Sequence, residues 1–119
     1  MPDPRDFSVR VEPRPDGAAV VVVAGEVDLS TGPELDGALR DAAAIGSRLV
    51  VDLSACTFLS STGLRALIEA EKARPPASPR IRIVVADPHL RKVFEIAGID
   101  SLFDLVDRDE PDSASSAAV

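Results

Sequence analysis

Three consecutive hydroxyl residues stand in the segment Phe-Leu-Ser-Ser-Thr-Gly-Leu (residues 58–64), between a predicted buried strand and a predicted helix. The first backbone N–H groups of a helix lack partners, and the helix dipole makes that end positive. A hydroxyl there can act as an N-cap, which contributes about 1 kcal/mol to stability. It can also be a phosphorylation site, because a helix N-terminus accommodates a phosphate. Both roles stay open, and one residue could serve in both.

Residue types that commonly do catalysis are scarce in this chain. His89, the one histidine, follows Asp87-Pro88 and is expected as a surface residue in the first turn of a helix. The one cysteine, Cys56, is expected as a small buried residue rather than as a reactive thiol. The 20 carboxylates form no evident catalytic pair, and no glycine-rich phosphate loop is present. We therefore expect a protein that is not an enzyme, with no catalytic residue, no metal and no cofactor.

Composition narrows the classes of partner. The 119 residues suit one domain, and 45% of them are hydrophobic. A net charge of −7 and only 3% aromatic residues argue against binding to nucleic acid or to an anionic membrane. The most apolar run, residues 18–24, is far shorter than the ~20 residues that span a bilayer. The first six residues also lack the pattern of a signal peptide, so we expect a cytoplasmic protein without membrane insertion.

The hydrophobic pattern predicts an alternation of strands and helices. Residues 7–12 alternate as a half-buried strand, Asp16-Gly17 signals a hairpin turn, and residues 18–24 read as a strand covered on both faces. After this hairpin we expect a helix ending at Gly46, a strand over 48–53 and a connection over 54–60. The remaining elements are expected as a helix from about Thr62 to before Arg74, a strand over 80–86, a helix from Pro88 to Gly98 and a short strand over 102–106.

This order, β-β-α-β-α-β-α-β, predicts an α/β fold in which helices pack on a mixed β-sheet. The single domain is expected to cover residues 7–106. Residues 1–6 are expected as a flexible N-terminus, and residues 107–119 as a disordered acidic and Ser/Ala-rich tail, because neither end has an apolar period to bury.

Two further features border the predicted helices. Thr31 and Glu34 form a candidate capping box at the start of the first helix. Just before it, Glu26 and Asp28 are either solvated carboxylates near a helix start or contacts for a partner.

On the second helix, the spacing of Leu64, Leu67 and Ile68 predicts a core-facing side, whereas Arg65 and Glu69 are predicted to be exposed. Gly63 lies in the first turn. Its missing Cβ either lets another chain approach closely or is simply tolerated there.

The sequence of residues 52–64, Asp-Leu-Ser-x3-Phe-Leu-Ser-Ser-Thr-Gly-Leu, together with Gly-Glu-Val-Asp at 25–28, resembles the STAS domain of bacterial anti-sigma factor antagonists. The resemblance extends over about residues 7–106 and implies a single STAS-like domain. The family pattern reads Asp-Leu-Ser-x3-Phe-x-Asp-Ser-x-Gly-Leu, and the serine of its Asp-Ser pair is phosphorylated by an anti-sigma factor that is also a serine kinase. By this match Ser61 is the acceptor. Ser60 stands where the family has Asp and is the second candidate for the phosphorylated residue.

The resemblance implies a role in transcription regulation, in a stress response or in sporulation. The chain would bind an anti-sigma factor with serine-kinase activity and free a sigma factor; phosphorylation at Ser61 would switch it off, and a serine phosphatase would restore it. The expected partner-binding residues are Glu26, Asp28, Ser60, Ser61, Thr62, Gly63 and Arg65. The alternative is a STAS scaffold or adaptor subunit of a signalling or transport assembly that is not phosphorylated. A small nucleotide-binding or hydrolytic protein is the third reading.

Overall fold

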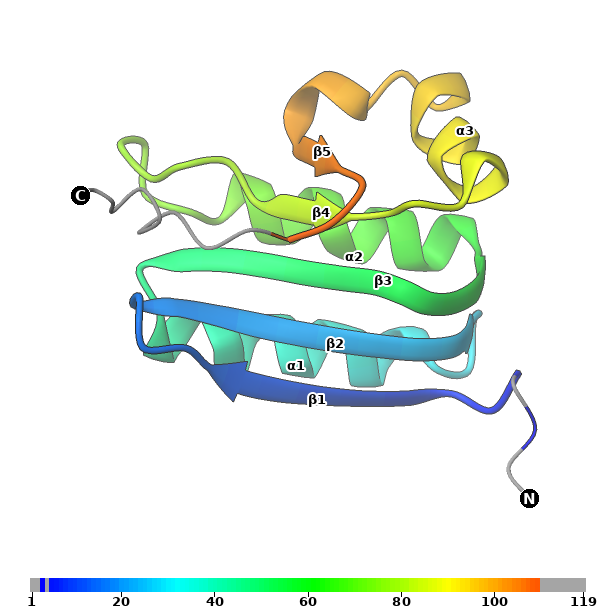
Figure 1. Cartoon of the computed structure of the whole chain (residues 1–119), viewed down its shortest axis with the longest axis horizontal. Helices are drawn as coiled ribbons and strands as arrows, with labels where there is room; N and C mark the ends of the chain where they lie inside the picture. Colours follow the sequence, from blue (N-terminus) through cyan, green and yellow to red (C-terminus); the bar gives the residue numbers. More distant parts are fainter. Residues whose placement is uncertain (1–2, 4, 110–119) are drawn as a thin grey trace.

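The computed structural model describes residue 3 and residues 5–109 as five strands, three α-helices and one short 3-10 helix (Figure 1). In chain order these are β1 (Ser8–Pro13), β2 (Ala18–Val27), α1 (Gly32–Ile45), β3 (Arg48–Leu59), α2 (Ser61–Lys72), β4 (Arg82–Val84), α3 (Pro88–Ile96), the 3-10 helix η1 (Asp100–Leu102) and β5 (Asp104–Val106). The predicted order of strands and helices is confirmed.

The strands form one mixed sheet in the order β1-β2-β3-β4-β5. β1 is antiparallel to β2, and the other neighbouring strands are parallel. Parallel strands end at the same edge of a sheet, so the last residues of β2 and β3, Val27 and Leu59, are paired there. α1 and α2 both begin just beyond this edge.

The hairpin between β1 and β2 forms where Asp16-Gly17 predicts it. Gly17 has a φ of +90°, a left-handed conformation that glycine adopts without steric cost. Its N–H donates to the Arg14 carbonyl at 3.0 Å, and the Arg14 N–H donates to the Ala18 carbonyl at 2.8 Å. These bonds close the turn and set the register of the first two strands.

The main core lies on the face of the sheet that α1 and α2 cover, behind the sheet in Figure 1, and it also includes Leu90 and Phe94 of α3. Leu35 and Leu39 of α1 and Leu67 of α2 are at most 2% exposed, and burying one such side chain contributes roughly 1.5–3 kcal/mol. The core-facing prediction is confirmed for Leu67. Leu64 and Ile68 are only partly buried, and they pack against the margin of the same cluster.

The predicted connection over residues 54–60 is wrong, because β3 continues as a strand to Leu59. β2 also runs on to Val27 and provides a hydrogen-bonding partner for this extension. The pairing contains two register shifts, one between Val22 and Ala24 and one between Gly25 and Glu26. Such irregularities break the alternation of side chains, so the extension gave no regular strand pattern. The strand predicted over 80–86 is shorter than expected and covers only β4.

The other face of the sheet, turned towards the viewer in Figure 1, carries no helix among the described residues. Four apolar residues there are nevertheless buried and form a second cluster: Ala18, Val20, Val50 and Val84. Residues 18–21 of β2 are buried without interruption, which confirms the prediction that this part of the strand is covered on both faces.

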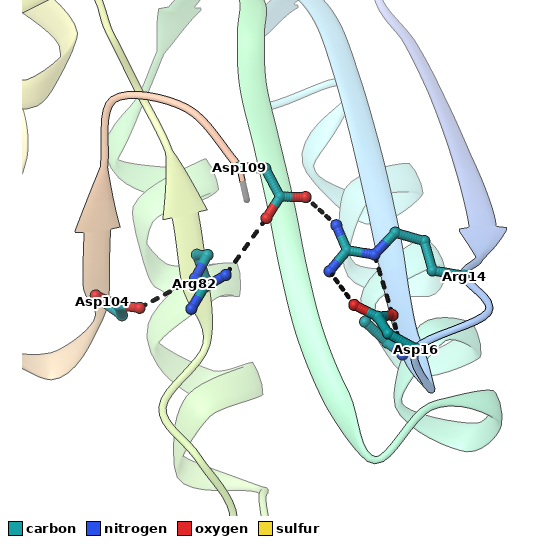
Figure 2. A network of polar contacts seen from close by, with 6 residues as sticks. Arg14, Asp16, Arg82, Asp104 and Asp109 are labelled. Atoms are coloured by element: carbon teal, nitrogen blue, oxygen red, sulfur yellow. Dashed lines mark hydrogen bonds and ion pairs between the residues drawn. The ribbon is translucent and has the colours of Figure 1, made fainter. Parts of the chain in front are cut away.

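A network of ion pairs crosses this second face (Figure 2). Arg14 pairs with Asp16 at 2.8 Å and with Asp109, and Arg82 pairs with Asp104 at 3.1 Å and with Asp109 at 3.5 Å. The two arginine side chains are 17% and 14% exposed. Asp109 therefore connects the β1–β2 turn with β4, so that residues far apart in the sequence meet over the sheet.

The two ends of the chain lie partly outside the described residues. Asp107 pairs with Arg91 at 3.2 Å, and together with Asp109 it places the beginning of the predicted tail against the domain. Residues 1, 2, 4 and 110–119 are outside the described part, so the flexible N-terminus and the disordered tail stay predictions. No described helix combines the length and hydropathy needed to cross a membrane.

Candidate functional site

The candidate site is the sheet edge where β2 and β3 end and where α1 and α2 begin. Ser60 is the N-cap of α2, with extended backbone (φ −81°, ψ 174°). Its N–H donates to the Val27 carbonyl at 2.9 Å, and its side-chain Oγ accepts from the Gly63 N–H at 3.4 Å. Ser60 is therefore half-buried and held by bonds on both sides, which confirms a capping role for one residue of the hydroxyl run.

Ser61 has a different environment from its neighbour. It is the first residue of α2 and is exposed. Within the described chain its Oγ makes no hydrogen bond, so the hydroxyl is open to a reagent or a partner. The two roles that the sequence left open are thus separable: Ser60 caps the helix, and Ser61 presents an accessible hydroxyl at the positive end of the helix dipole.

Thr62 brings the starts of the two helices together. A Cβ added to Gly32, the first residue of α1, would lie 2.5 Å from Thr62 Cγ2. The absence of a side chain at Gly32 therefore allows α1 and α2 to approach closely at this edge. Thr62 is half-buried in this contact.

The structure corrects the interpretation of Gly63. This glycine is buried, and an added Cβ would lie 2.5 Å from Leu59 Cδ1 and 2.8 Å from Val27 Cγ1. The space that its missing side chain opens is filled by the protein's own sheet. Gly63 is therefore neither an open approach for another chain nor merely tolerated: it lets the first turn of α2 pack closely on β2 and β3.

The loop between β2 and α1 is organised by Asp28. Its Oδ1 accepts from the Ser30 hydroxyl at 2.8 Å, the Ser30 N–H at 3.0 Å and the Thr31 N–H at 3.1 Å. The Ser30 hydroxyl, followed by the Thr31 N–H, lowers the pKa of the Asp28 carboxyl below its ordinary value. Asp28 is thus ionised at neutral pH and lies at the candidate edge.

The predicted capping box at Thr31 and Glu34 is wrong. Thr31 is the N-cap of α1 by position, but its side chain makes no capping hydrogen bond. Instead, Thr31 Oγ1 accepts from the Asp28 N–H at 2.9 Å and donates to the Glu26 carbonyl at 3.2 Å. The Thr31 hydroxyl therefore bonds to the backbone of the loop that precedes α1, the same loop whose N–H groups donate to the Asp28 carboxylate.

Glu26 lies on the same edge, near the end of β2, and is half-buried. Its Cα partner on β3 is Phe58. Sequence reasoning missed that Phe58 is 50% exposed and that Leu29, in the loop after β2, is 80% exposed. Exposed large apolar side chains are candidates for partner contact. The only signal for Leu29 was its place between turn residues outside any hydrophobic period.

Arg65 is exposed on α2, one turn after Ser61, as predicted. Both residues line a groove between α2 and the segment that follows α3, which we call the α2 groove. It is lined by Ser61, Leu64, Arg65, Ile68, Glu69 and Lys72 of α2, and by Ala97 and Ile99.

The residues considered for enzymatic chemistry do not assemble into a site here. Cys56 is buried in β3, its Sγ lies 3.4 Å from the Phe58 carbonyl oxygen, and burial raises the pKa of its thiol. His89 is exposed in the first turn of α3, where its N–H donates to the N-cap Asp87 at 2.9 Å. In residue 3 and residues 5–109, no group of three or more His, Cys, Asp or Glu side chains could hold a metal ion.

The fold and the site define a class: a single α/β domain with a mixed five-stranded sheet and two adjacent serines at the start of α2, the first of which caps the helix. Residues 11–107 match the protein family described as "Mlab, STAS domain", and the chain belongs to this STAS-domain family. The single STAS-like domain that the sequence predicts is thereby confirmed. The antagonist members of the family are regulatory binding proteins.

Similar proteins carry consistent names. The chain is 33% identical over 90 residues to the anti-sigma-F factor antagonist RsfB of Mycobacterium tuberculosis, covering 75% of this chain and 73% of RsfB. It is 30% identical over 101 residues to the putative anti-sigma factor antagonist BtrV of Bordetella bronchiseptica, covering 84% of this chain and 87% of BtrV. A crystal structure of an anti-sigma factor antagonist from Mycobacterium paratuberculosis superposes with a TM-score of 0.81 at 32% identity, covering 98% of this chain and 97% of that one.

Proposed function

We propose that this protein is an anti-sigma factor antagonist of the cytoplasm. It binds an anti-sigma factor with serine-kinase activity through the edge where α1 and α2 begin, and so frees a sigma factor. Phosphorylation of Ser61 switches this binding off. The observation that carries the proposal is the exposed, unbonded hydroxyl of Ser61 at the start of α2, next to a serine that already caps the helix. The names of the similar proteins RsfB and BtrV support the general role.

The chemical step is a phosphoryl transfer from ATP. Ser61 Oγ forms a bond to the γ-phosphorus and gives its proton to a base of the kinase, while the bond between that phosphorus and the β–γ bridging oxygen breaks and ADP leaves. The product carries close to two negative charges and three acceptor oxygens. Because the cap is provided by Ser60 and not by Ser61, the helix start keeps its hydrogen bond after modification. We therefore expect the fold to be unchanged and the effect to fall on the complex.

In a close-packed interface, the new dianion loses hydration and repels any carboxylate opposite. A penalty of about 3 kcal/mol weakens binding roughly a hundredfold, which is enough for a switch. A serine phosphatase would reverse the switch by hydrolysing the phosphoester with water, which restores the hydroxyl.

One observation favours a second candidate, a STAS scaffold or adaptor that is not phosphorylated. Ser60 stands where the family pattern has an aspartate, so the chain lacks the negative charge next to the acceptor. A kinase that reads this charge would not recognise Ser61. The protein would then bind its partner constitutively.

The test is to incubate the protein with ATP and the serine-kinase anti-sigma factor of the same organism, and to measure intact mass and the modified position. We expect one phosphate on Ser61. Ser61→Ala should keep partner binding and accept no phosphate, whereas Ser61→Asp should weaken binding. Ser54→Ala, which removes another exposed serine, in β3 and outside α2, is the matched control. Absence of phosphate in an active kinase reaction would favour the scaffold, and equal binding of Ser61→Asp and wild type would refute the interface.

A further inference from the structure

The α2 groove is lined by apolar side chains and by three charged residues of α2, of which two are basic and one, Glu69, is acidic. Its apolar lining consists of Leu64 and Ile68 of α2 together with Ala97 and Ile99, and Arg65 and Lys72 belong to α2. Ile96, the last residue of α3 and the neighbour of Ala97 in sequence, is 78% exposed. An exposed apolar surface of this kind, bordered by charge, is typical of an interaction site.

The two cations that line the groove have no partner within the described part of the chain. The arginines that form ion pairs with carboxylates there include Arg5, Arg10, Arg14, Arg40, Arg82 and Arg91. Arg65 and Lys72 form no ion pair or side-chain hydrogen bond with any described residue, although Glu69 lies between them on the helix. On a chain with a net charge of −7, two such cations beside an apolar groove indicate an acidic, apolar ligand.

The spacing of the cations fits a helix as that ligand. Arg65 and Lys72 are seven residues apart, which is two helical turns or about 10 Å along the axis. A second helix laid along the groove presents carboxylates at the same spacing, and its residues three and four positions further on point to the same face. Glu69, midway between the cations, disfavours an occupant with a third carboxylate there.

We propose that the α2 groove binds an amphipathic acidic helix of a partner protein. Two carboxylates seven residues apart on that helix pair with Arg65 and Lys72, and the apolar side chains between them pack on Leu64 and Ile68.

The link to regulation rests on the proposed function. Ser61 lines the same groove and stands four residues before Arg65, so a phosphate on Ser61 lies within reach of this guanidinium. The phosphate then competes with the partner's carboxylate for Arg65. Modification therefore closes the groove by charge, without a change of shape.

The probe is a dye-labelled synthetic helical peptide with two glutamates seven residues apart and two leucines between them. Binding is measured by fluorescence anisotropy, and the contacted residues by amide chemical shifts of the full chain. We expect shifts confined to residues 61–72 and 96–99. Arg65→Glu and Lys72→Glu should each weaken peptide binding roughly five- to tenfold. Arg40→Glu, an exposed residue of α1 with the same change in net charge, is the matched control and should change it less than about twofold.

Three results would refute the proposal that the α2 groove binds an acidic helix. These are equal binding of a peptide with lysines in place of the glutamates, shifts outside the groove, and an equal loss of binding in the Arg40→Glu control.

The same variants separate this inference from the proposed function. One outcome is that the anti-sigma factor binds and phosphorylation of Ser61 abolishes this binding, but the Arg65→Glu variant binds this partner like wild type. The proposed function is then supported, and the proposal that the groove binds the partner is refuted. If the peptide binds in the groove but active kinase leaves Ser61 unmodified, the groove is supported as a binding site and the phosphorylation switch is refuted.

Discussion

The Ser60 N–H donates to the Val27 carbonyl across 2.9 Å, and this bond ties the start of α2 to the end of β2. Ser60 is thereby held in extended backbone, with its side chain turned towards the Gly63 N–H. The next residue, Ser61, is the first residue of α2, and it is exposed. Adjacent serines thus differ in role because one backbone hydrogen bond fixes where the helix starts.

Alanine substitutions should separate these two serines. Ser60→Ala removes the cap from the Gly63 N–H and should lower the free energy of unfolding by about 1 kcal/mol. Ser61→Ala removes an exposed hydroxyl with no described partner and should change it by less than about 0.5 kcal/mol. Urea denaturation at neutral pH measures both. A larger loss in Ser61→Ala than in Ser60→Ala would contradict the assignment of the cap.

Gly63→Ala should destabilise the protein, although alanine is the better helix former. The added Cβ would lie 2.5 Å from Leu59 Cδ1 and 2.8 Å from Val27 Cγ1, so the packing of α2 on the sheet must shift. We expect a cost of about 1–3 kcal/mol by thermal or urea denaturation.

Gly37→Ala is the matched control for Gly63→Ala. An added Cβ at Gly37, in α1, meets nothing within 4 Å. This substitution should stabilise the protein by roughly 0.5–1 kcal/mol. If both variants gained stability, the close packing at Gly63 would be wrong.

Asp28 should make stability depend on pH in the acid range. Its pKa is lowered in the folded protein by the Ser30 hydroxyl and the Thr31 N–H, so its contribution is present above the unfolded value of about 3.9. That contribution is lost as pH falls through the lower folded pKa. Asp28→Asn keeps an acceptor oxygen but does not ionise.

The stability difference between wild type and Asp28→Asn should therefore be larger at pH 6 than at pH 3. Chemical denaturation at the two pH values measures it. A difference that is the same at both would mean that the carboxylate charge is not what orders the loop.

Asp109 should stabilise the domain from the face that carries no described helix. Asp109→Ala leaves Arg14 and Arg82, which are 17% and 14% exposed, with one carboxylate partner fewer each. Because Asp16 and Asp104 still pair with them, we expect a modest loss of about 1 kcal/mol.

Asp36→Ala is the control for Asp109→Ala, since it breaks an exposed pair with Arg40 on one helix face. That pair should contribute less than about 0.5 kcal/mol and should weaken further in salt. Equal effects of the two variants in urea denaturation would show that Asp109 is an ordinary surface charge.

The order of elements could be predicted from the sequence because each element signals itself locally. The Asp16-Gly17 turn, the Asp87-Pro88 helix start and the Gly98 helix end, with a φ of +74°, depend on the backbone preferences of a few adjacent residues. The run of three hydroxyl residues at a helix start likewise marks the candidate edge by residue type alone.

The sequence by itself therefore determined the alternation of strands and helices, the acidic character and the edge that carries the serines. Tertiary structure decided what depends on neighbours distant in the sequence. Val27 fixes Ser60 as the cap, β2 extends β3 to Leu59, Leu59 and Val27 fill the space beside Gly63, and Asp109 reaches Arg14 and Arg82. Local backbone preferences depend on adjacent residues and can be predicted from the sequence, whereas these contacts join distant residues and form only when the chain folds.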